Sequence, residues 1–260
     1  FSWIQNTKLD LKLMVTDFEE IRNLEDRELL EKYLIWEKPN IFIDFDNKYM
    51  VNLYHDRLFE QMVPKSWTSI YAKSFEDLEN ILISKNINSS TIIINAYGVI
   101  PQSSKDYLLN EKIYIKVNSI FPHILLSLCN KYKAKLIHPT TDCVYDGMKG
   151  NYIETDIHTG KDIYSISKSL GELSENGEYI CIRSSIIGEE FKNKRSLIEW
   201  VKSNKNGNIE GYTNHYWNGI TCLEYSKFIH KVIEKNMYNN KLIHIFSPER
   251  ISKYELVCLI

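Results

Sequence analysis

The run Thr91-Ile92-Ile93-Ile94-Asn95-Ala96 is apolar through its centre, as is usual for a strand that is buried on both faces of a sheet. A long helical pattern over roughly residues 111–133 follows it, and a second apolar run, Ala134-Lys135-Leu136-Ile137-His138, comes next. Strand, helix and strand at this spacing are typical of parallel strands joined by helical crossovers. We therefore predict an α/β fold built on a Rossmann-like, doubly wound parallel sheet.

The alternation of strand and helix continues on both sides of this segment. Upstream, Ser74 and Asp77 fit the start of a helix that is expected to end near Lys85. Downstream, the pattern predicts strands over residues 179–183 and 241–246. It also predicts helices around residues 162–172, over residues 195–204, after Thr221 and over residues 252–260.

The first 60 residues have a different character. They contain no glycine and a single proline, Pro39. We expect an amphipathic helix from Asp17 to Trp36, and a hairpin made of two strand-like runs, residues 41–45 and 50–54. Residues 1–60 are therefore an unassigned N-terminal segment, and residues 61–260 are expected to form the Rossmann-like domain. Because the chain begins without methionine and stops inside a helical pattern, we expect it to be a piece of a longer polypeptide.

The composition narrows the class of protein. The 32 basic and 34 acidic residues nearly balance, which gives no reason to expect a nucleic acid or an anionic membrane as partner. No apolar run reaches the length of a membrane span. The five cysteines are scattered without a C-x-x-C pair, as is typical of reduced thiols in a cytoplasmic protein. The histidines lack the spacing of a metal site, so no metal is expected.

Tyr164 and Lys168 carry the chemical signal of this sequence. Four residues apart on a helix, they share a face, and an ammonium beside a phenol favours the phenolate. A phenol tuned in this way can exchange a proton with a carbonyl or hydroxyl oxygen. Thr141 follows a predicted strand, at the end where parallel sheets place their ligands, and its hydroxyl can hold the same oxygen. The three residues indicate an oxidoreductase that acts on a ketone or a secondary alcohol.

Simpler interpretations of these residues exist. The spacing Y-x-x-x-K is weak evidence in a chain with 17 tyrosines, and it recurs at Tyr145 and Lys149 within a turn-like composition. Tyr164 and Lys168 alone would fit an ordinary surface pair, and Thr141 alone would fit a hydroxyl that caps the local backbone. All three residues, each after the appropriate element, are less easily explained by chance.

A set of stretches resembles one known family in the family's order. They include Ile-Ile-Ile-Asn-Ala-Tyr-Gly-Val-Ile-Pro-Gln (92–102), Val-Asn-Ser-Ile-Phe-Pro-His-Ile-Leu (117–125), His-Pro-Thr-Thr-Asp-Cys-Val-Tyr-Asp-Gly (138–147), residues 150–156, the Tyr164 helix, residues 182–188 and residues 211–221. Over about residues 67–260 the chain resembles the extended short-chain dehydrogenase/reductases, and within them the dTDP-4-dehydrorhamnose reductase-like sugar-nucleotide reductases.

The resemblance implies an activity and roles for individual residues. It implies reduction of a 4-keto nucleotide-deoxysugar in polysaccharide biosynthesis, with NADP or NAD as cofactor. It is also compatible with a homodimer. Tyr164 would be the proton donor, Lys168 would tune it and hold the nicotinamide ribose, and Thr141 would position the carbonyl. Asn118 would support the lysine through a water molecule. Ala96, Tyr97 and Gly98 would line the cofactor site. The residues that would contact the sugar nucleotide are Val144, Trp217 and Asn218, and the alternative for Trp217 is a packing role.

The N-terminus departs from the family pattern. Members of this family begin with a strand and a Gly-x-x-Gly-x-x-Gly turn, where a Cβ would obstruct the pyrophosphate. Here the first glycine is Gly98. Three explanations remain open. The natural sequence continues upstream and residues 1–60 are an insertion or a fused segment; or the first half of the fold is replaced and the cofactor is held differently; or the protein has lost its cofactor and become a non-catalytic binding or regulatory module.

Overall fold

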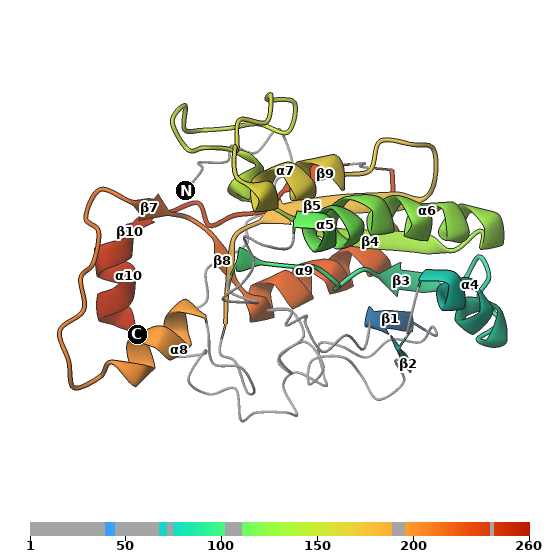
Figure 1. Ribbon diagram of the computed structural model, residues 1–260, viewed down its shortest axis with the longest axis horizontal. Helices are drawn as coiled ribbons and strands as arrows, with labels where there is room; N and C mark the ends of the chain where they lie inside the picture. The colour runs from blue at the N-terminus through green and yellow to red at the C-terminus, as the bar shows by residue number, and fades with distance from the viewer. Residues whose placement is uncertain (1–39, 45–67, 72–74, 102–110, 189–195, 240–241) are drawn as a thin grey trace.

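The computed structural model describes residues 40–44, 68–71, 75–101, 111–188, 196–239 and 242–260. Its centre is a six-stranded sheet in the order β2-β1-β3-β4-β5-β9, in which every neighbouring pair is parallel (Figure 1). The strands are β1 (Asn40–Asp44), β2 (Thr68–Tyr71), β3 (Ile92–Ile94), β4 (Lys135–Thr141), β5 (Tyr179–Ser184) and β9 (Leu242–His244). The prediction of a Rossmann-like parallel sheet is confirmed.

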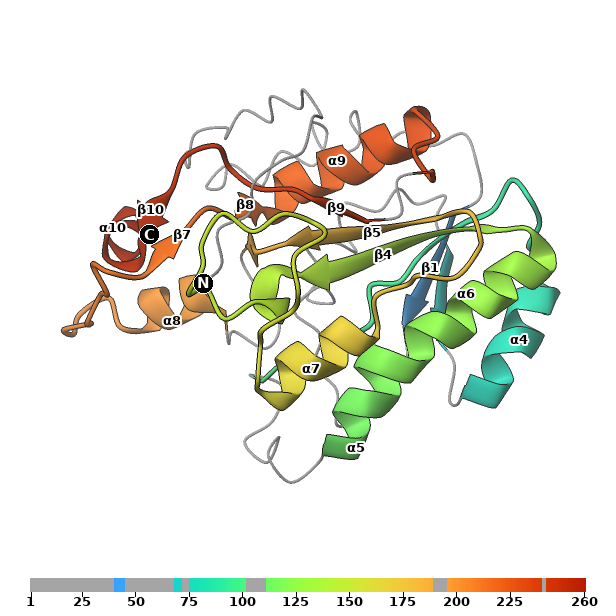
Figure 2. The same cartoon turned by 90° about the horizontal axis from the view of Figure 1, so that it is seen from above.

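Helices cover both faces of this sheet (Figure 2). One face carries α4 (Phe75–Ser84), α5 (Glu111–Tyr114), the π-helix η4 (Ile115–Ile120), α6 (Phe121–Tyr132) and α7 (Ile163–Leu170), and the other carries α9 (Cys222–Glu234). The predicted helix over residues 111–133 is thus present, but six residues in its middle form a wider π-helical turn. A π-helical turn inside a helix is rare and is often found at functional sites.

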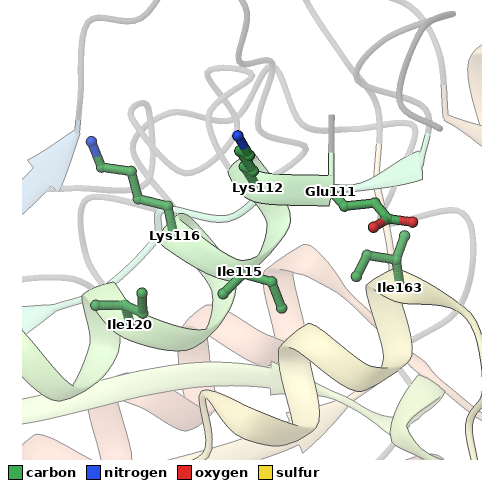
Figure 3. Close-up of a pocket in the computed structure, with 6 residues that line it drawn as sticks. All are labelled: Glu111, Lys112, Ile115, Lys116, Ile120 and Ile163. Atoms are coloured by element: carbon green, nitrogen blue, oxygen red, sulfur yellow. The ribbon is translucent and has the colours of Figure 1, made fainter. Parts of the chain in front are cut away.

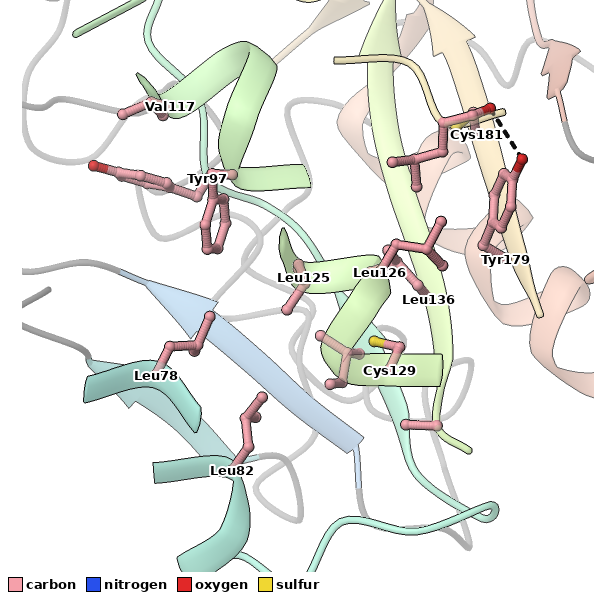
Figure 4. Close-up of a cluster of buried hydrophobic side chains, with 14 of the residues drawn as sticks. Leu78, Leu82, Tyr97, Val117, Leu125, Leu126, Cys129, Leu136, Tyr179 and Cys181 are labelled. Atoms are coloured by element: carbon pink, nitrogen blue, oxygen red, sulfur yellow. Dashed lines mark hydrogen bonds between the residues drawn. The ribbon is translucent and has the colours of Figure 1, made fainter. Parts of the chain in front are cut away.

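The two faces of the central strands contribute to two separate cores. Ile93, Leu136 and Cys181 point to the face that carries α4, α6 and α7, whereas Ile94 and Ile137 point to α9. Figure 4 shows the first core, where leucines of α4 and α6 converge on the side chains of β4 and β5. Because successive side chains of a strand alternate between faces, burial on both sides explains the continuous apolar runs in the sequence.

Short elements, all but one of them from the C-terminal part of the chain, lie beyond the ends of β4 and β5 (Figures 1 and 2). They are the 3-10 turn η5 (Asp142–Val144), β6 (Ile186–Ile187), α8 (Leu197–Ser203), β7 (Tyr216–Trp217), β8 (Ile220–Thr221), β10 (Ile251–Ser252) and α10 (Lys253–Leu259). Strand β7 pairs with β10, and β6 pairs with β8. The helices predicted after Thr221 and over residues 252–260 are present, and α10 begins with a complete capping box between Ser252 and Glu255.

The hairpin prediction for the N-terminal segment is wrong. Strand β1 lies between β2 and β3 and pairs in parallel with both, so residues 41 and 42 have no edge left for an antiparallel partner. Among the described residues, the first strand of the sheet is β1, which begins at Asn40 inside the segment that the sequence left unassigned. Residues 50–54, the predicted helix over residues 17–36 and Ser74 lie outside the described residues. None of the helices in the described ranges is long and apolar enough to cross a membrane.

Candidate active site

Helix α7 positions Tyr164 and Lys168. It begins after Asp162, whose carboxylate accepts a hydrogen bond from the Ser165 backbone N–H at 3.0 Å and so caps the first turn. Tyr164 and Lys168 follow one turn apart on this helix, as the sequence predicts. Tyr164 is half-buried against the core beneath α7, while Lys168 is only 6% exposed.

The ammonium of Lys168 is the most unusual group in the site. It forms no hydrogen bond or ion pair with any residue in the described part of the chain, although it is buried. Burial lowers the pKa of Lys168 to about 8, and the nearby Glu172 carboxylate opposes that shift. A Cβ at Gly98 would lie 3.8 Å from the ammonium nitrogen, so the Gly98 backbone runs close to this group. An ammonium on a largely buried side chain can bind acceptor oxygens, for example those of a ligand.

Asn118 connects the chain after β3 to α7. Its amide nitrogen donates to the Val99 carbonyl at 2.8 Å and to the Ser167 hydroxyl at 3.1 Å, and its amide oxygen accepts from the Val99 N–H at 2.8 Å. The π-helix η4 carries this fully buried side chain. Asn118 therefore fixes the backbone around Gly98 relative to the helix of Lys168 by direct contacts. Its predicted support of the lysine through water stays a prediction.

Thr141 ends β4 and begins η5. Its hydroxyl oxygen accepts a hydrogen bond from the Cys143 backbone N–H at 3.1 Å, which is the capping role that the simpler interpretation expects. The hydroxyl proton lies toward the Asp142 carboxylate at a long oxygen–oxygen distance of 3.4 Å. Such a weak bond leaves the proton able to turn toward a ligand oxygen, so capping and substrate positioning are compatible.

Gly160 brings the end of β4 and the beginning of α7 together. A Cβ at this position would lie 2.5 Å from the Ser165 Cβ and 2.9 Å from the Cys143 carbonyl oxygen. Ser165 adjoins Tyr164, and Cys143 is two residues from Thr141. The glycine therefore permits a close approach that places Thr141 and Tyr164 at the same end of the sheet.

The other predicted site residues are more deeply involved in packing. Val144 is fully buried with Tyr145 and Tyr152, so its side chain has no surface to offer a substrate. Trp217 packs in a cluster of the C-terminal part and donates from its indole nitrogen to the Ser185 hydroxyl at 2.7 Å, as the packing alternative expects. Ala96 and Tyr97 are buried, and the Asn218 carbonyl accepts from the Ser247 N–H at 2.7 Å. The side chains of Val144 and Trp217 are therefore buried in packing clusters.

Comparison with protein-family models identifies the family of this chain. The family model described as the RmlD substrate binding domain matches residues 109–260, which is more than half of the chain. The chain belongs to this family. The resemblance to the dTDP-4-dehydrorhamnose reductase-like group is thereby confirmed, and the matched range includes Asn118, Thr141, Tyr164 and Lys168.

Solved structures share the fold of this RmlD-family chain. A hypothetical dTDP-4-dehydrorhamnose reductase from Sulfolobus tokodaii is 25% identical, with 85% of this chain and 80% of that chain covered and a TM-score of 0.62. A dTDP-4-dehydrorhamnose reductase from Bacillus anthracis in complex with NADP is 17% identical, with 86% and 79% covered and a TM-score of 0.68. A UDP-N-acetylglucosamine 4-epimerase from Methanobrevibacter ruminantium is 16% identical, with 86% and 81% covered and a TM-score of 0.60. A search of curated proteins gave no significant match.

The RmlD-family chain also contains a buried polar network that the sequence did not reveal. The Arg183 guanidinium on β5 donates to both carboxylate oxygens of Glu172, at 2.7 and 2.6 Å. It also donates to the Nε2 atoms of His244, at 2.8 Å, and His158, at 2.6 Å, and to the Tyr145 hydroxyl. In the sequence only Gly-Glu after the Tyr164 helix and Ile-Arg-Ser at residues 182–184 hint at these partners, because the network joins segments that are far apart.

This network makes the fold sensitive to acid. Burial and the charge of Arg183 lower the pKa of His244 from 6.5 to about 3. Since the unfolded chain then binds the extra proton between these two values, the fold loses stability as pH falls below 6.5, by up to about 1.4 kcal/mol per pH unit. His244→Gln, which keeps an acceptor toward Arg183, is expected to reduce this slope. Urea denaturation of both proteins across this pH range measures it, and equal slopes would contradict the assignment.

A pocket of about 650 Å³ lies on the outer side of the helices (Figure 3). Its lining residues are Glu111, Lys112, Ile115, Lys116, Ile120 and Ile163. Ile163 adjoins Tyr164 in sequence, but neither Tyr164 nor Lys168 lines this pocket. The candidate site is therefore defined by the groups around the end of β4 and Lys168, and not by this cavity.

Proposed function

We propose that this chain catalyses NAD(P)H-dependent reduction of the 4-keto group of a nucleotide-linked deoxysugar, in a pathway that makes polysaccharide. The observation that carries the proposal is the ammonium of the largely buried Lys168, which lacks a hydrogen-bond partner among the described residues and lies close to Gly98. Membership of the RmlD substrate binding domain family and the NADP bound by the Bacillus anthracis relative support the same proposal.

The residues around Lys168 fit the nicotinamide end of a dinucleotide. The two hydroxyls of its ribose would supply the acceptor oxygens that the ammonium lacks. The backbone of Ala96, Tyr97 and Gly98 would border the ring, held in place by Asn118 through Val99. When bound, the reduced nicotinamide supplies the hydride. Nothing in these contacts distinguishes NADP from NAD, so both belong in the assay.

The side chains of this site would supply the proton that the carbonyl oxygen gains during reduction. As the carbonyl carbon accepts the hydride, its oxygen gains negative charge, and the Tyr164 phenol donates its proton to that oxygen. The Lys168 ammonium stabilises the phenolate that remains. The Thr141 hydroxyl donates a hydrogen bond to the same oxygen and orients the substrate. The product is a secondary alcohol, with the hydride on carbon and the phenol proton on oxygen.

The sugar nucleotide would enter from the C-terminal part of the chain. Asn218 is half-buried at the end of β7, beyond the ends of β4 and β5. We propose that the Asn218 side chain contacts the nucleotide-sugar. Trp217 would support this region by packing, and Val144 would contribute only backbone atoms. These assignments rest on position in the fold and follow from the proposed activity.

A second candidate function is a non-catalytic binding module. The observation in its favour is the sequence after β1, the strand that lies between β2 and β3. Rossmann folds bind a pyrophosphate on a glycine-rich turn after a strand of the parallel sheet. No glycine occurs before Gly98, and the residues directly after β1 read Phe45-Asp46-Asn47-Lys48-Tyr49. A member of the family that had lost its cofactor would show this pattern.

A turnover assay separates the two candidates. The chain is incubated with dTDP-4-dehydrorhamnose and NADPH or NADH, and both loss of the reduced cofactor and gain of two hydrogens in the sugar are measured. The proposed function requires both signals to appear together and to depend on enzyme concentration. Binding of the sugar nucleotide with no oxidation of either cofactor would favour the non-catalytic module instead.

A further inference from the structure

Residues 95–99 leave the sheet at a position where parallel sheets bind ligands. In the sheet, β2 lies on one side of β1 and β3 on the other, so the order of the strands reverses between β1 and β3. Ligands of such sheets bind at the carboxyl ends of the strands where the order reverses. The segment begins at the carboxyl end of β3, and a Cβ at Gly98 would lie 3.8 Å from the Lys168 ammonium nitrogen. The conformation of residues 95–99 therefore affects what the site can bind.

Asn95 holds the first half of this segment. It is 1% exposed, and its backbone N–H donates to the Ile137 carbonyl of β4 at 2.9 Å. Its side-chain oxygen accepts a hydrogen bond from the Tyr97 backbone N–H at 3.2 Å, which closes a turn over two residues. One buried residue thus ties the Tyr97 backbone to the neighbouring strand.

His138 on β4 determines which way the Asn95 amide is turned. The amide nitrogen donates to the His138 Nδ1 at 3.1 Å, while the amide oxygen is engaged by the Tyr97 N–H. Nδ1 must then be the accepting nitrogen, so the proton of the neutral imidazole is on Nε2. Burial holds the pKa of His138 well below its usual value, so the ring remains this neutral acceptor near neutral pH.

Asn118 holds the other half of the segment. Its amide group donates to the Val99 carbonyl and accepts from the Val99 N–H, both at 2.8 Å. Between the two halves lies Gly98, whose N–H and C=O groups form no hydrogen bond with any residue that the structure describes. Gly98 is buried, and buried peptide groups in proteins are nearly always hydrogen-bonded. These two groups are therefore candidates for hydrogen bonds to a ligand of the site.

We infer that Asn95 is a positioning residue of the cofactor site: turned by His138, its amide oxygen fixes the Tyr97 backbone and so presents the peptide groups of Gly98 to the cofactor. This inference rests on the proposed function for the identity of the ligand. Asn95 acts through the backbone of residues 97 and 98 and does not touch the reacting atoms. A segment that is fixed before binding does not have to be ordered by the ligand, which favours affinity.

Replacing Asn95 by leucine tests this role, because it removes the amide and keeps a side chain of similar size. The Kd of NADPH or NADH, whichever the unaltered chain binds more tightly, is expected to rise at least about tenfold. The occupied site regains its geometry, so kcat at saturating cofactor is expected to stay within about threefold and the loss falls on KM. An unchanged Kd in the folded variant overturns the inference.

Asn88→Leu is the matched control at the other end of β3. The Asn88 side-chain oxygen accepts from the Ser90 backbone N–H at 2.9 Å in the same kind of turn, on the exposed surface. Asn88→Leu is expected to leave the Kd unchanged. Equal losses of affinity in the two variants would mean that Asn95 supports β3 and not the cofactor site, which also overturns the inference.

Two NMR measurements on the unliganded protein test the contacts themselves. The Tyr97 amide hydrogen is expected to exchange at least about tenfold faster in Asn95→Leu than in the unaltered chain. In Asn95→Asp the carboxylate can accept but not donate, so the His138 Nδ1 is expected to carry a proton, which the nitrogen chemical shifts of the ring report. Unchanged exchange of Tyr97, or an Nδ1 that stays unprotonated in Asn95→Asp, overturns the inference.

A double variant covers a loss of folding. Asn95→Leu leaves the buried His138 Nδ1 without its donor, whereas Asn95→Leu with His138→Leu replaces both partners by apolar groups. The double variant is expected to show the same weaker binding and the same faster Tyr97 exchange, and normal values of either would contradict the inference. Absence of cofactor binding by the unaltered chain would refute the proposed function, and the Tyr97 exchange would still decide whether Asn95 fixes this backbone.

Discussion

Replacing Tyr164 by phenylalanine is expected to lower kcat by about 100-fold to 10,000-fold while the protein stays folded. The substitution removes one oxygen from a half-buried ring, so the packing against the core beneath α7 is retained. The loss falls on kcat because the phenol is needed when the carbonyl oxygen gains charge and not for binding. Turnover with dTDP-4-dehydrorhamnose and NADPH measures the effect, and a thermal melt confirms the fold.

A matched control distinguishes this effect from a general loss of tyrosine hydroxyls. Tyr132 ends α6, shortly before β4 begins at Lys135, whereas Thr141 lies at the other end of that strand. The Tyr132 hydroxyl donates to Glu79 at 2.9 Å. Tyr132→Phe is expected to leave kcat unchanged and to cost at most about 1.5 kcal/mol of stability. If Tyr164→Phe reduces the substrate at the rate of the unaltered protein, Tyr164 is not the proton donor.

Replacing Gly171 by alanine is expected to cause the largest loss of stability of any single methyl addition in the described chain. A Cβ there would lie 1.8 Å from the Asn118 carbonyl oxygen and 2.9 Å from its carbon, so α7 and η4 would have to separate. Ordinary overpacking costs about 1–3 kcal/mol, and here the obstacle is backbone that cannot rotate away. We expect a loss of at least about 3 kcal/mol in urea denaturation, or no folded protein.

Gly207 provides the comparison for this substitution. A Cβ at Gly207 would meet only the Asn204 carbonyl oxygen, at 3.6 Å, and the residue is exposed. Gly207→Ala is expected to change the free energy of unfolding by no more than about 0.5 kcal/mol. Equal effects of the two substitutions would mean that η4 and the end of α7 do not approach as closely as the structure has them.

Much of the sheet could be predicted because its strands carry a local signal. β3, β4 and β5 are buried on both faces, and their apolar runs allow few other interpretations. β1 carries the same kind of signal, but its partners are 24 or more residues away in the chain, and the turn-like residues 46–48 suggested a nearer one. Pairing between distant strands is set by the whole sheet and cannot be inferred from one run.

The candidate site shows the same division. The spacing of Tyr164 and Lys168 is a property of one helix, and Thr141 ends one strand, so the sequence was sufficient to place these three residues on their elements. Asn118 on the π-helical turn is hydrogen-bonded to the Val99 backbone, a contact that no local pattern of residues 111–133 contains. The Arg183 network and the burial of Val144 likewise depend on side chains from separate segments, and only the assembled fold brings them together.

Titration of the chain with NADPH and NADH, followed by the fluorescence of the reduced nicotinamide, tests the central claim most directly. The proposal predicts saturable binding at micromolar concentrations of at least one of the two cofactors. It also predicts binding at least about tenfold weaker in Lys168→Met, because that variant removes the ammonium that would hold the ribose. Absence of saturable binding by the unaltered chain at millimolar nucleotide would contradict a cofactor site at Lys168 and favour the non-catalytic module.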